Sequence, residues 1–179
     1  SGSGKSTIAK LMAGFFDADD GRIYFGDQDV KNIPTAQLMK HVAYVAQDNF
    51  LFDTSIRENL KIAKADATDE EIQAALKAAN CLELIERLPE GLNSNAGDCG
   101  KFLSGGERQR ITLARAMLAD AQCIILDEAT AYADVENEAK IQEALSRLMK
   151  DKTLIVVAHR LNTIVGADQI MVLAHGKIE

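Results

Sequence analysis

The sequence predicts an α/β domain in which a mostly parallel sheet is covered by helices on both faces. Short apolar runs rich in β-branched residues indicate buried strands at 42–46, 123–126, 154–157 and 170–173. Segments with helical spacing separate these runs, and that alternation is typical of parallel sheets. With 179 residues, of which 47% are hydrophobic, the chain is long enough to form one domain with its own core.

The segments between the strands carry helix signals. Residues 5–13 and 135–149 each place apolar side chains at helical spacing. Two Ser/Thr-x-x-Glu patterns mark further helix starts, Thr68 with Glu71 and Ser104 with Glu107. Residues 21–30 predict a short hairpin.

The strand signals also predict how the domain is divided. Residues 48–114 contain no convincing strand. We therefore expect an all-helical insertion there, between two sheet-forming parts at 1–47 and 115–179.

Composition argues against several classes of protein. The net charge of −7 and the pI of about 5.0 argue against a basic nucleic-acid footprint. No apolar run approaches the roughly 20 residues of a membrane-spanning helix, and the first residues do not resemble a signal peptide. The three cysteines lack Cys-x-x-Cys spacing, so we expect reduced thiols without a metal.

The chain opens with a heptapeptide rich in glycine and serine, directly before a helical pattern. Its residues are Ser1, Gly2, Ser3, Gly4, Lys5, Ser6 and Thr7. They match the end of the phosphate-binding loop G-x-x-x-x-G-K-[ST], where backbone N–H groups and a helix N-terminus bind phosphate. Lys5 would then reach the β- and γ-phosphates of a nucleotide, and Ser6 would ligate Mg²⁺. By themselves these residues could also form a flexible terminus.

Two acids follow the apolar run at 123–126. A buried parallel strand that ends in an acid places that acid beside the phosphate loop. Asp127 suits the coordination shell of Mg²⁺, and Glu128 suits activation of an attacking water as a general base. An exposed pair of acids at a strand end, common in α/β proteins, is the other interpretation of these residues.

The most specific motif lies at 103–110 and reads Leu-Ser-Gly-Gly-Glu-Arg-Gln-Arg. In this order, between the phosphate loop and the acidic strand end, it resembles the L-S-G-G-[QE] signature of the ABC ATPase family. The resemblance implies that Ser104, Gly105, Gly106 and Glu107 contact ATP held by a second such domain. It also implies a P-loop NTPase fold over residues 1–179, with a RecA-like core and an inserted helical subdomain that carries the signature.

The same resemblance assigns roles to three residues that would be unremarkable alone. Gln47 lies where the family has its Q-loop glutamine, which senses Mg²⁺ or the attacking water and so belongs with both the catalytic and the metal-binding residues. His159 lies where the family has a switch histidine, which contacts the γ-phosphate and positions the water. Asp134 matches the last residue of the D-loop, which crosses to the partner's site.

Residues 50–60 are similar to exporter-type members, in which this stretch meets cytoplasmic loops of the membrane domain, although its apolar residues could equally be core. The resemblance thus implies an enzyme that binds ATP and Mg²⁺ and hydrolyses ATP to drive transport of a substrate. Its implied partners are a second nucleotide-binding domain, arranged head to tail, and a transmembrane domain fused upstream. That domain would hold the chain at the cytoplasmic face of a membrane, and no nucleic acid is expected to bind.

Two alternatives remain at this point. One is a soluble ABC ATPase of the translation or DNA-repair type. The spacing from Lys5 to Ser104 holds no sustained heptads and the charge is acidic, which disfavours it. The other is a module that folds without holding ATP, since the resemblance implies that the chain is truncated at both ends and lacks the first glycine of the loop.

The chain departs from the family pattern at two internal positions. Residues 131–134 read Ala-Tyr-Ala-Asp where Ser-Ala-Leu-Asp is usual, and residues 97–100 read Gly-Asp-Cys-Gly where exporters carry Gly-Glu-Arg-Gly.

Overall fold

The fold is organised around a short parallel sheet. A computed structural model describes residues 2–127, 135–148, 152–158 and 166–179. The sheet has the strand order β3, β4, β5, with both neighbouring pairs parallel. The three strands are β3 (Val42–Val45), β4 (Cys123–Asp127) and β5 (Thr153–Val157). Each lies within one residue of the bounds that the sequence predicts.

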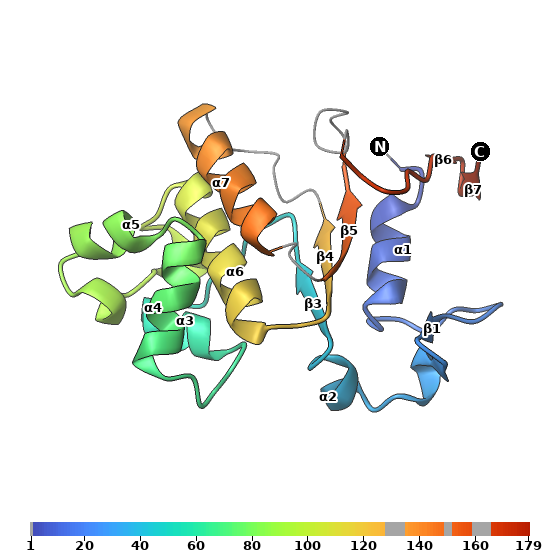
Figure 1. Ribbon diagram of the computed structural model, residues 1–179, viewed down its shortest axis with the longest axis horizontal. Coiled ribbons are helices and arrows are strands. Elements are labelled where there is room, and N and C mark those ends of the chain that lie inside the picture. Colours follow the sequence, from blue (N-terminus) through green and yellow to red (C-terminus); the bar gives the residue numbers. More distant parts are fainter. Residues whose placement is uncertain (1, 128–134, 149–151, 159–165) are drawn as a thin grey trace.

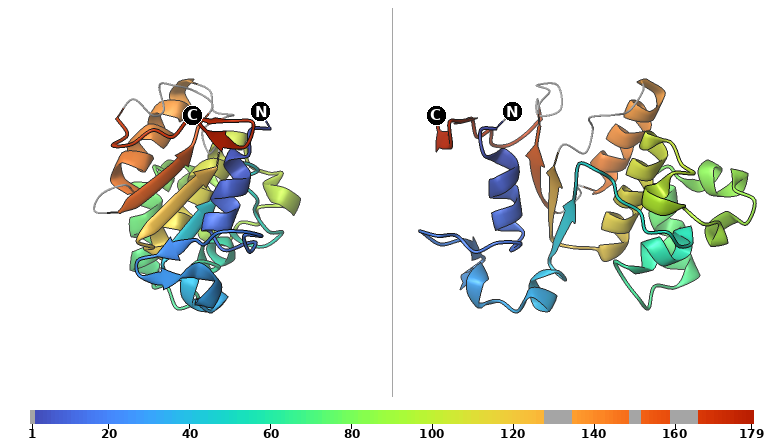
Figure 2. Two further views of the ribbon diagram at one scale, coloured as in Figure 1. Left: turned by 90° about the vertical axis from the view of Figure 1, so that its right-hand side faces the viewer. Right: turned by 180° about the vertical axis from the view of Figure 1, so that it is seen from behind.

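Helices cover the sheet on both faces. Figure 1 shows α1 on one face and α6 and α7 on the other, and the view from behind in Figure 2 shows the same layers. These helices are α1 (Lys5–Met12), α6 (Gly105–Ala119) and α7 (Val135–Leu148). The predicted parallel sheet with helices on both faces is therefore confirmed.

Strand β4 is the centre of the sheet, and all five of its residues are buried. Successive side chains of a strand point to opposite faces. Ile124 and Leu126 join the larger core, under α6 and α7. Cys123 and Ile125 join the smaller core, which contains Ala9 of α1. The next residue on the α1 face is Asp127, so the alternation itself aims this acid at α1.

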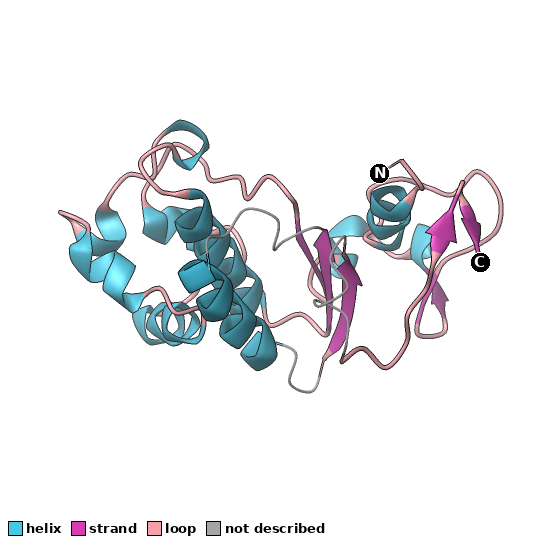
Figure 3. Ribbon diagram, turned by 90° about the horizontal axis from the view of Figure 1, so that it is seen from above, coloured by secondary structure: helices cyan, strands magenta, loops and turns pink. Residues whose placement is uncertain are grey.

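Between β3 and β4 the chain forms helices and loops, with one isolated bridge between Ser55 and Asn95. Figure 3 shows these helices gathered at one end of the molecule, beyond the sheet. They are α3 (Ile56–Lys61), α4 (Asp69–Ala78), α5 (Leu82–Arg87), the 3₁₀ turns Gly91–Asn93 and Asp98–Gly100, and α6. The division at 48–114 stays a prediction, and its second boundary falls inside the continuous helix α6.

The remaining elements lie at the other end of the molecule. The predicted hairpin at 21–30 is confirmed by the antiparallel pair β1 (Tyr24–Phe25) and β2 (Gln28–Asp29). It is followed by a 3₁₀ turn at Val30–Asn32 and by α2 (Thr35–Leu38).

The predicted buried strand at 170–173 is wrong. Ile170, Met171 and Val172 are each more than half exposed. Only Leu173 enters a strand, β6 (Leu173–Ala174), which pairs antiparallel with β7 (Lys177–Ile178). The composition of the run suits a sheet interior, but among the described residues no strand of the parallel sheet lies beside it.

None of the helices in the described part of the chain is both long enough and apolar enough to cross a bilayer.

A buried asparagine holds the loop before α3 against α6. The side chain of Asn59 is fully buried, and its Oδ1 accepts hydrogen bonds from the backbone N–H of Phe52 (2.8 Å) and from Arg115 of α6 (3.0 Å). Its Nδ2 donates to the carbonyl oxygens of Phe52 (3.0 Å) and Ser55 (3.1 Å). Arg115 also donates to the Asn59 carbonyl at 2.8 Å. One buried side chain thus provides hydrogen-bond partners for partly buried backbone groups of the loop and for Arg115 of α6.

Helix α6, which carries the signature, begins with the predicted capping box. The hydroxyl of Ser104 accepts from the backbone N–H of Glu107 (3.3 Å), and the carboxylate of Glu107 accepts from the backbone N–H of Ser104 (2.8 Å). Arg87 also donates to Glu107. Burial opposes ionisation of Glu107, but these hydrogen bonds outweigh it and the pKa of Glu107 is lowered. The predicted box of Thr68 and Glu71 on α4 is confirmed as well.

We expect Asn59→Ala to lower the free energy of unfolding by about 2–3 kcal/mol, because it removes a fully buried side chain and leaves the partly buried N–H of Phe52 without its acceptor and the guanidinium of Arg115 without one of its acceptors. Urea unfolding of the 179-residue chain measures this loss. Asn93→Ala is the matched control, since Asn93 is exposed, and it should change the value by less than about 0.5 kcal/mol. Equal losses from the two variants would contradict the assignment.

Glu107→Gln should keep the cap, because the amide oxygen of glutamine can also accept from Ser104, but it removes the charge beside Arg87. The lowered pKa of Glu107 means that its charge stabilises the fold fully above the unfolded value of about 4.3. That contribution is lost as the pH falls through the lowered folded pKa. The difference in unfolding free energy between the wild type and Glu107→Gln, about 0.5 kcal/mol at neutral pH, should therefore shrink on acidification. A difference that stays constant down to about pH 3 would contradict this.

Candidate functional site

The phosphate loop and helix α1 form one half of the site. Gly4 lies in the left-handed region, with φ of 94°, and caps α1 at its N-terminus. Gly2 also has a positive φ of 80°, and among the described residues nothing beyond the immediate chain neighbours lies within 4 Å of the position that a Cβ would take on either glycine. These conformations favour glycine. The first N–H groups of α1 follow directly after Gly4 and have no acceptor within the helix. This arrangement suits an anion such as a nucleotide phosphate.

Lys5 and Ser6 occupy the first turn of α1. The Nζ of Lys5 donates to the hydroxyl of Ser3 at 2.9 Å, so the lysine folds back over the loop. The hydroxyl of Ser6 donates to Oδ1 of Asp127 at 2.9 Å. The structure therefore brings together the two sequence motifs that lie 121 positions apart in the chain, and the predicted meeting of phosphate loop and acidic strand end is observed.

Asp127 is the buried acid of this cluster, with 5% of its surface exposed. Its second oxygen, Oδ2, accepts a hydrogen bond from the hydroxyl of Tyr44 at 2.7 Å. Burial and the hydrogen bond to Asp127 raise the pKa of Tyr44, so the tyrosine stays protonated and acts as a donor. Sequence reasoning missed Tyr44. The available signal was a hydroxyl-bearing side chain within an otherwise aliphatic strand, three positions before Gln47.

The donor set at this place fits Mg²⁺ bound together with a nucleotide. The described part of the chain contains no group of three or more acids, histidines or cysteines that would hold a metal by itself. Mg²⁺ in nucleotide-binding proteins is commonly held by one or two protein oxygens together with substrate phosphates. Ser6 and Asp127 provide such oxygens beside the phosphate loop, so the residues present fit the ion.

Gln47 follows β3 at the same edge of the sheet. The parallel register pairs Val45 with Leu126, so the chain beyond β3 runs beside the end of β4 where Asp127 lies. Gln47 is exposed, and its backbone carbonyl oxygen accepts a hydrogen bond from the side-chain amide of Asn49 at 3.2 Å. Its side chain is therefore available to a ligand at this edge.

The signature lies at a separate place. Figure 1 shows the N-terminal ends of α1 and α6 at the same edge of the sheet but on opposite faces. Ser104 is exposed and Gly106 is buried. The hydrogen bonds of Ser104 described above are with Glu107, and none joins it to Ser3, Lys5 or Ser6 in the described part of the chain. The chain therefore presents two helix N-termini, and they do not form a single site.

Four predicted site residues belong to the part of the chain that the structure does not describe. They are Ser1, Glu128, Asp134 and His159, and their roles remain predictions. Thr7 is described and exposed, in the first turn of α1.

The stretch that resembles exporters divides into buried and exposed parts. Leu51 is fully buried, whereas Phe50 and Phe52 are 43% and 50% exposed. Their rings meet edge to face with centroids 5.0 Å apart. Leu51 is thus a core residue, and the two phenylalanines form an exposed aromatic pair on a loop that Asn59 fixes.

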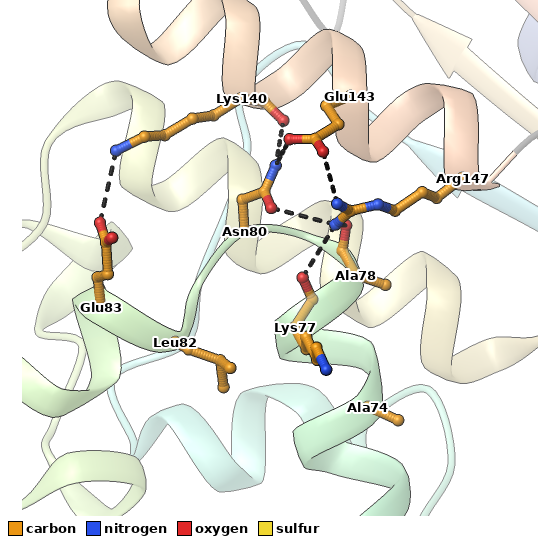
Figure 4. A pocket seen from close by; sticks show the side chains of 9 residues that line it. All are labelled: Ala74, Lys77, Ala78, Asn80, Leu82, Glu83, Lys140, Glu143 and Arg147. Carbon is orange, nitrogen blue, oxygen red and sulfur yellow. Dashed lines mark hydrogen bonds and ion pairs between the residues drawn. The ribbon is translucent and has the colours of Figure 1, made fainter.

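A hollow of about 780 Å³ lies elsewhere, between α7 and the ends of α4 and α5 (Figure 4). No predicted site residue lines it. Arg147 of α7 spans it, donating to the carbonyl oxygens of Lys77 (3.2 Å) and Ala78 (3.1 Å) and to the side chains of Asn80 (3.1 Å) and Glu143 (2.6 Å). These bonds tie α7 to the end of α4, so the polar lining serves to join helices.

Comparisons with known proteins point to the same family as the sequence motifs do. The profile of the ABC transporter family matches residues 1–131. YfiC of Bacillus subtilis (strain 168), described as an uncharacterized ABC transporter ATP-binding protein, is 46% identical over 177 residues, which cover 99% of this chain and 29% of YfiC. The mycobactin import ATP-binding/permease protein IrtA of Mycolicibacterium smegmatis is 48% identical over 178 residues, which cover 99% of this chain and 21% of IrtA.

A solved structure gives the same result at the level of the fold. A bacterial Atm1-family ABC exporter with ATP bound matches with a TM-score of 0.92 and 37% sequence identity, over 99% of this chain and 31% of the exporter chain. The chain thus spans between 21% and 31% of the lengths of these three proteins. Because the family profile covers most of the chain and the fold agrees throughout, the chain belongs to the ABC transporter family, and the predicted P-loop NTPase fold with its inserted helices is confirmed.

Proposed function

We propose that this chain is the ATP-binding and ATP-hydrolysing domain of an exporter-type ABC transporter. The observation that carries the proposal is the hydrogen bond of Ser6 to Asp127 at the N-terminus of α1, which joins a phosphate-binding loop to a buried acid. Family membership supports the same function. The names of the relatives are those of transporters, which disfavours a soluble ATPase of the translation or DNA-repair type.

The residues around Asp127 would divide the work. Lys5 and the N–H groups of α1 would bind the β- and γ-phosphates, which compensates their charge. Ser6 and Asp127, with Gln47 nearby, would hold Mg²⁺, which neutralises charge that develops on the phosphates. Glu128 would accept a proton from the attacking water as a general base, and His159 would hold that water in line.

The position of the signature supports a composite site. Since the N-terminus of α6 lies across the sheet from the chain's own phosphate loop, it is free to meet ATP on a second copy or a similar domain. Ser104, Gly105 and Gly106 would then bind the γ-phosphate from the far side, with Glu107 capping the helix and Asp134 crossing between the two sites. Two domains arranged head to tail would enclose two ATP molecules.

A transmembrane domain is the second partner in this proposal. This chain covers only 21% to 31% of its relatives, so they are about three to five times as long as the chain. IrtA is named as an ATP-binding/permease protein. A membrane domain in the same protein, upstream of this chain, would keep the chain at the cytoplasmic face. The exposed pair of Phe50 and Phe52 offers an apolar contact for it.

The direction of transport and the cargo would be decided by that membrane domain. One relative is named for import and the matching structure is an exporter, so the nucleotide-binding part is compatible with either. The proposal is therefore ATP-driven transport, with the cargo left to residues outside this chain.

Glu128→Gln should lower the rate of ATP hydrolysis by the full-length protein about 10²–10⁴-fold, because it removes the general base. ATP affinity should stay within about twofold, since a neutral isostere leaves the phosphate loop intact. The hydrolysis rate and equilibrium ATP binding are measured side by side. The control is Glu90→Gln, because Glu90 is an exposed acid in the segment between β3 and β4. Hydrolysis at the wild-type rate would contradict the role of Glu128, and absence of ATP binding by the wild type would contradict the function itself.

Ser104→Arg should separate binding from hydrolysis in a different way. The bulky cation obstructs the partner-facing end of α6 but leaves the chain's own phosphate loop untouched. We expect the rate of ATP hydrolysis to fall at least about 10-fold. The affinity for ATP, measured while the two domains are apart, should change less than about threefold. Ser104→Thr, which keeps a hydroxyl and the helix cap, should retain most activity. Loss of ATP binding in proportion to activity would show that the signature serves the chain's own nucleotide.

A further inference from the structure

Tyr44 lies outside the recognised motifs and yet contacts the acid of the candidate metal site. It is the third residue of β3, and the parallel register pairs it with Ile125 of β4. Ile125 and Asp127 point to the α1 face of the sheet, and the Tyr44 ring packs against the core on that same face. Asp127 lies two residues beyond Ile125 on β4, and the tyrosine hydroxyl therefore reaches it from the neighbouring strand β3.

The direction of the tyrosine is fixed by packing. Its ring lies against Phe15 with centroids 4.9 Å apart and an interplanar angle of 60°. A tilted contact of this kind is favourable for aromatic pairs. With the backbone held in β3 and the ring held by Phe15, the hydroxyl has little freedom, and its 2.7 Å hydrogen bond to Oδ2 is preorganised.

The carboxylate of Asp127 is consequently held at both oxygens. Oδ1 accepts from Ser6 at 2.9 Å and Oδ2 accepts from Tyr44. A carboxylate with only the first bond could rotate about its Cβ–Cγ bond, and at 5% exposure little water would be present to replace the missing donor. The tyrosine bond turns Oδ1 toward Ser6 and the phosphate loop.

We propose that Tyr44 is a positioning residue, which orients the Asp127 carboxylate toward the Mg²⁺ that accompanies ATP. This inference rests on the proposed function. Hydrogen-bond partners that orient a metal-binding carboxylate commonly account for about 10–100-fold in metal affinity or activity. Tyr44 acts through Asp127, so its effect should be confined to states that contain the metal.

Tyr44→Phe isolates the hydroxyl, because it keeps the ring that packs on Phe15. In the full-length protein we expect ATP affinity measured with Mg²⁺ to fall about 10-fold, and ATP affinity measured with a chelator in place of Mg²⁺ to change less than about twofold. The Mg²⁺ concentration that gives half-maximal hydrolysis should rise by a similar factor, and saturating Mg²⁺ should restore most of kcat. Tyr24→Phe removes the same atom from an exposed tyrosine of β1 and should change none of these quantities.

The outcomes separate the inference from the function on which it rests. Equal losses of ATP affinity with and without Mg²⁺, together with a lower melting temperature, would show that the hydroxyl only stabilises the fold, and would overturn the inference. Wild-type affinity in both conditions would overturn it as well. If the wild type itself binds no ATP in a Mg²⁺-dependent way, the proposed function fails, whatever Tyr44→Phe does.

Discussion

The arrangement of this domain depends on the hydrogen bonds that satisfy the buried carboxylate of Asp127. A carboxylate taken out of water is costly unless donors satisfy it. Here the donors are Ser6 on α1 and Tyr44 on β3. Asp127 itself ends β4, the central strand, so one acid connects a helix and two strands. The same contacts that make its burial tolerable also set the phosphate loop against the edge of the sheet.

The second organising feature is the continuity of α6. The helix begins at the signature, with Ser104 as its cap, and ends four residues before β4. Along its length, Arg115 bonds to the carbonyl of Asn59 and to that of Phe50 (3.3 Å). The signature, the exposed aromatic loop and the acidic strand are thus attached to one rigid element.

The sequence was wrong about the run at 170–173 and left residues 50–52 undecided, because in both places the outcome depends on neighbouring elements that local composition does not specify. The run at 170–173 has the residues of a buried strand, but a strand is buried only when others flank it, and its partner is a two-residue hairpin strand. In residues 50–52 the three apolar side chains are alike in composition. Only the packing of α3 and α6 decides that Leu51 is inside and its two neighbours are outside.

The sequence by itself determined the class of the domain, the three parallel strands that it placed at 42–46, 123–126 and 154–157, the two capping boxes and the order of the motifs. These depend on local periodicity, on capping chemistry and on short motifs, all of which are written in consecutive residues. Tertiary structure alone decided that Ser6, Tyr44 and Asp127 meet, because their contact depends on strand register and on which face of β4 receives α1. It also decided that the two helix N-termini open on opposite faces of the sheet, because only the packing of α1 and α6 fixes the face on which each helix lies.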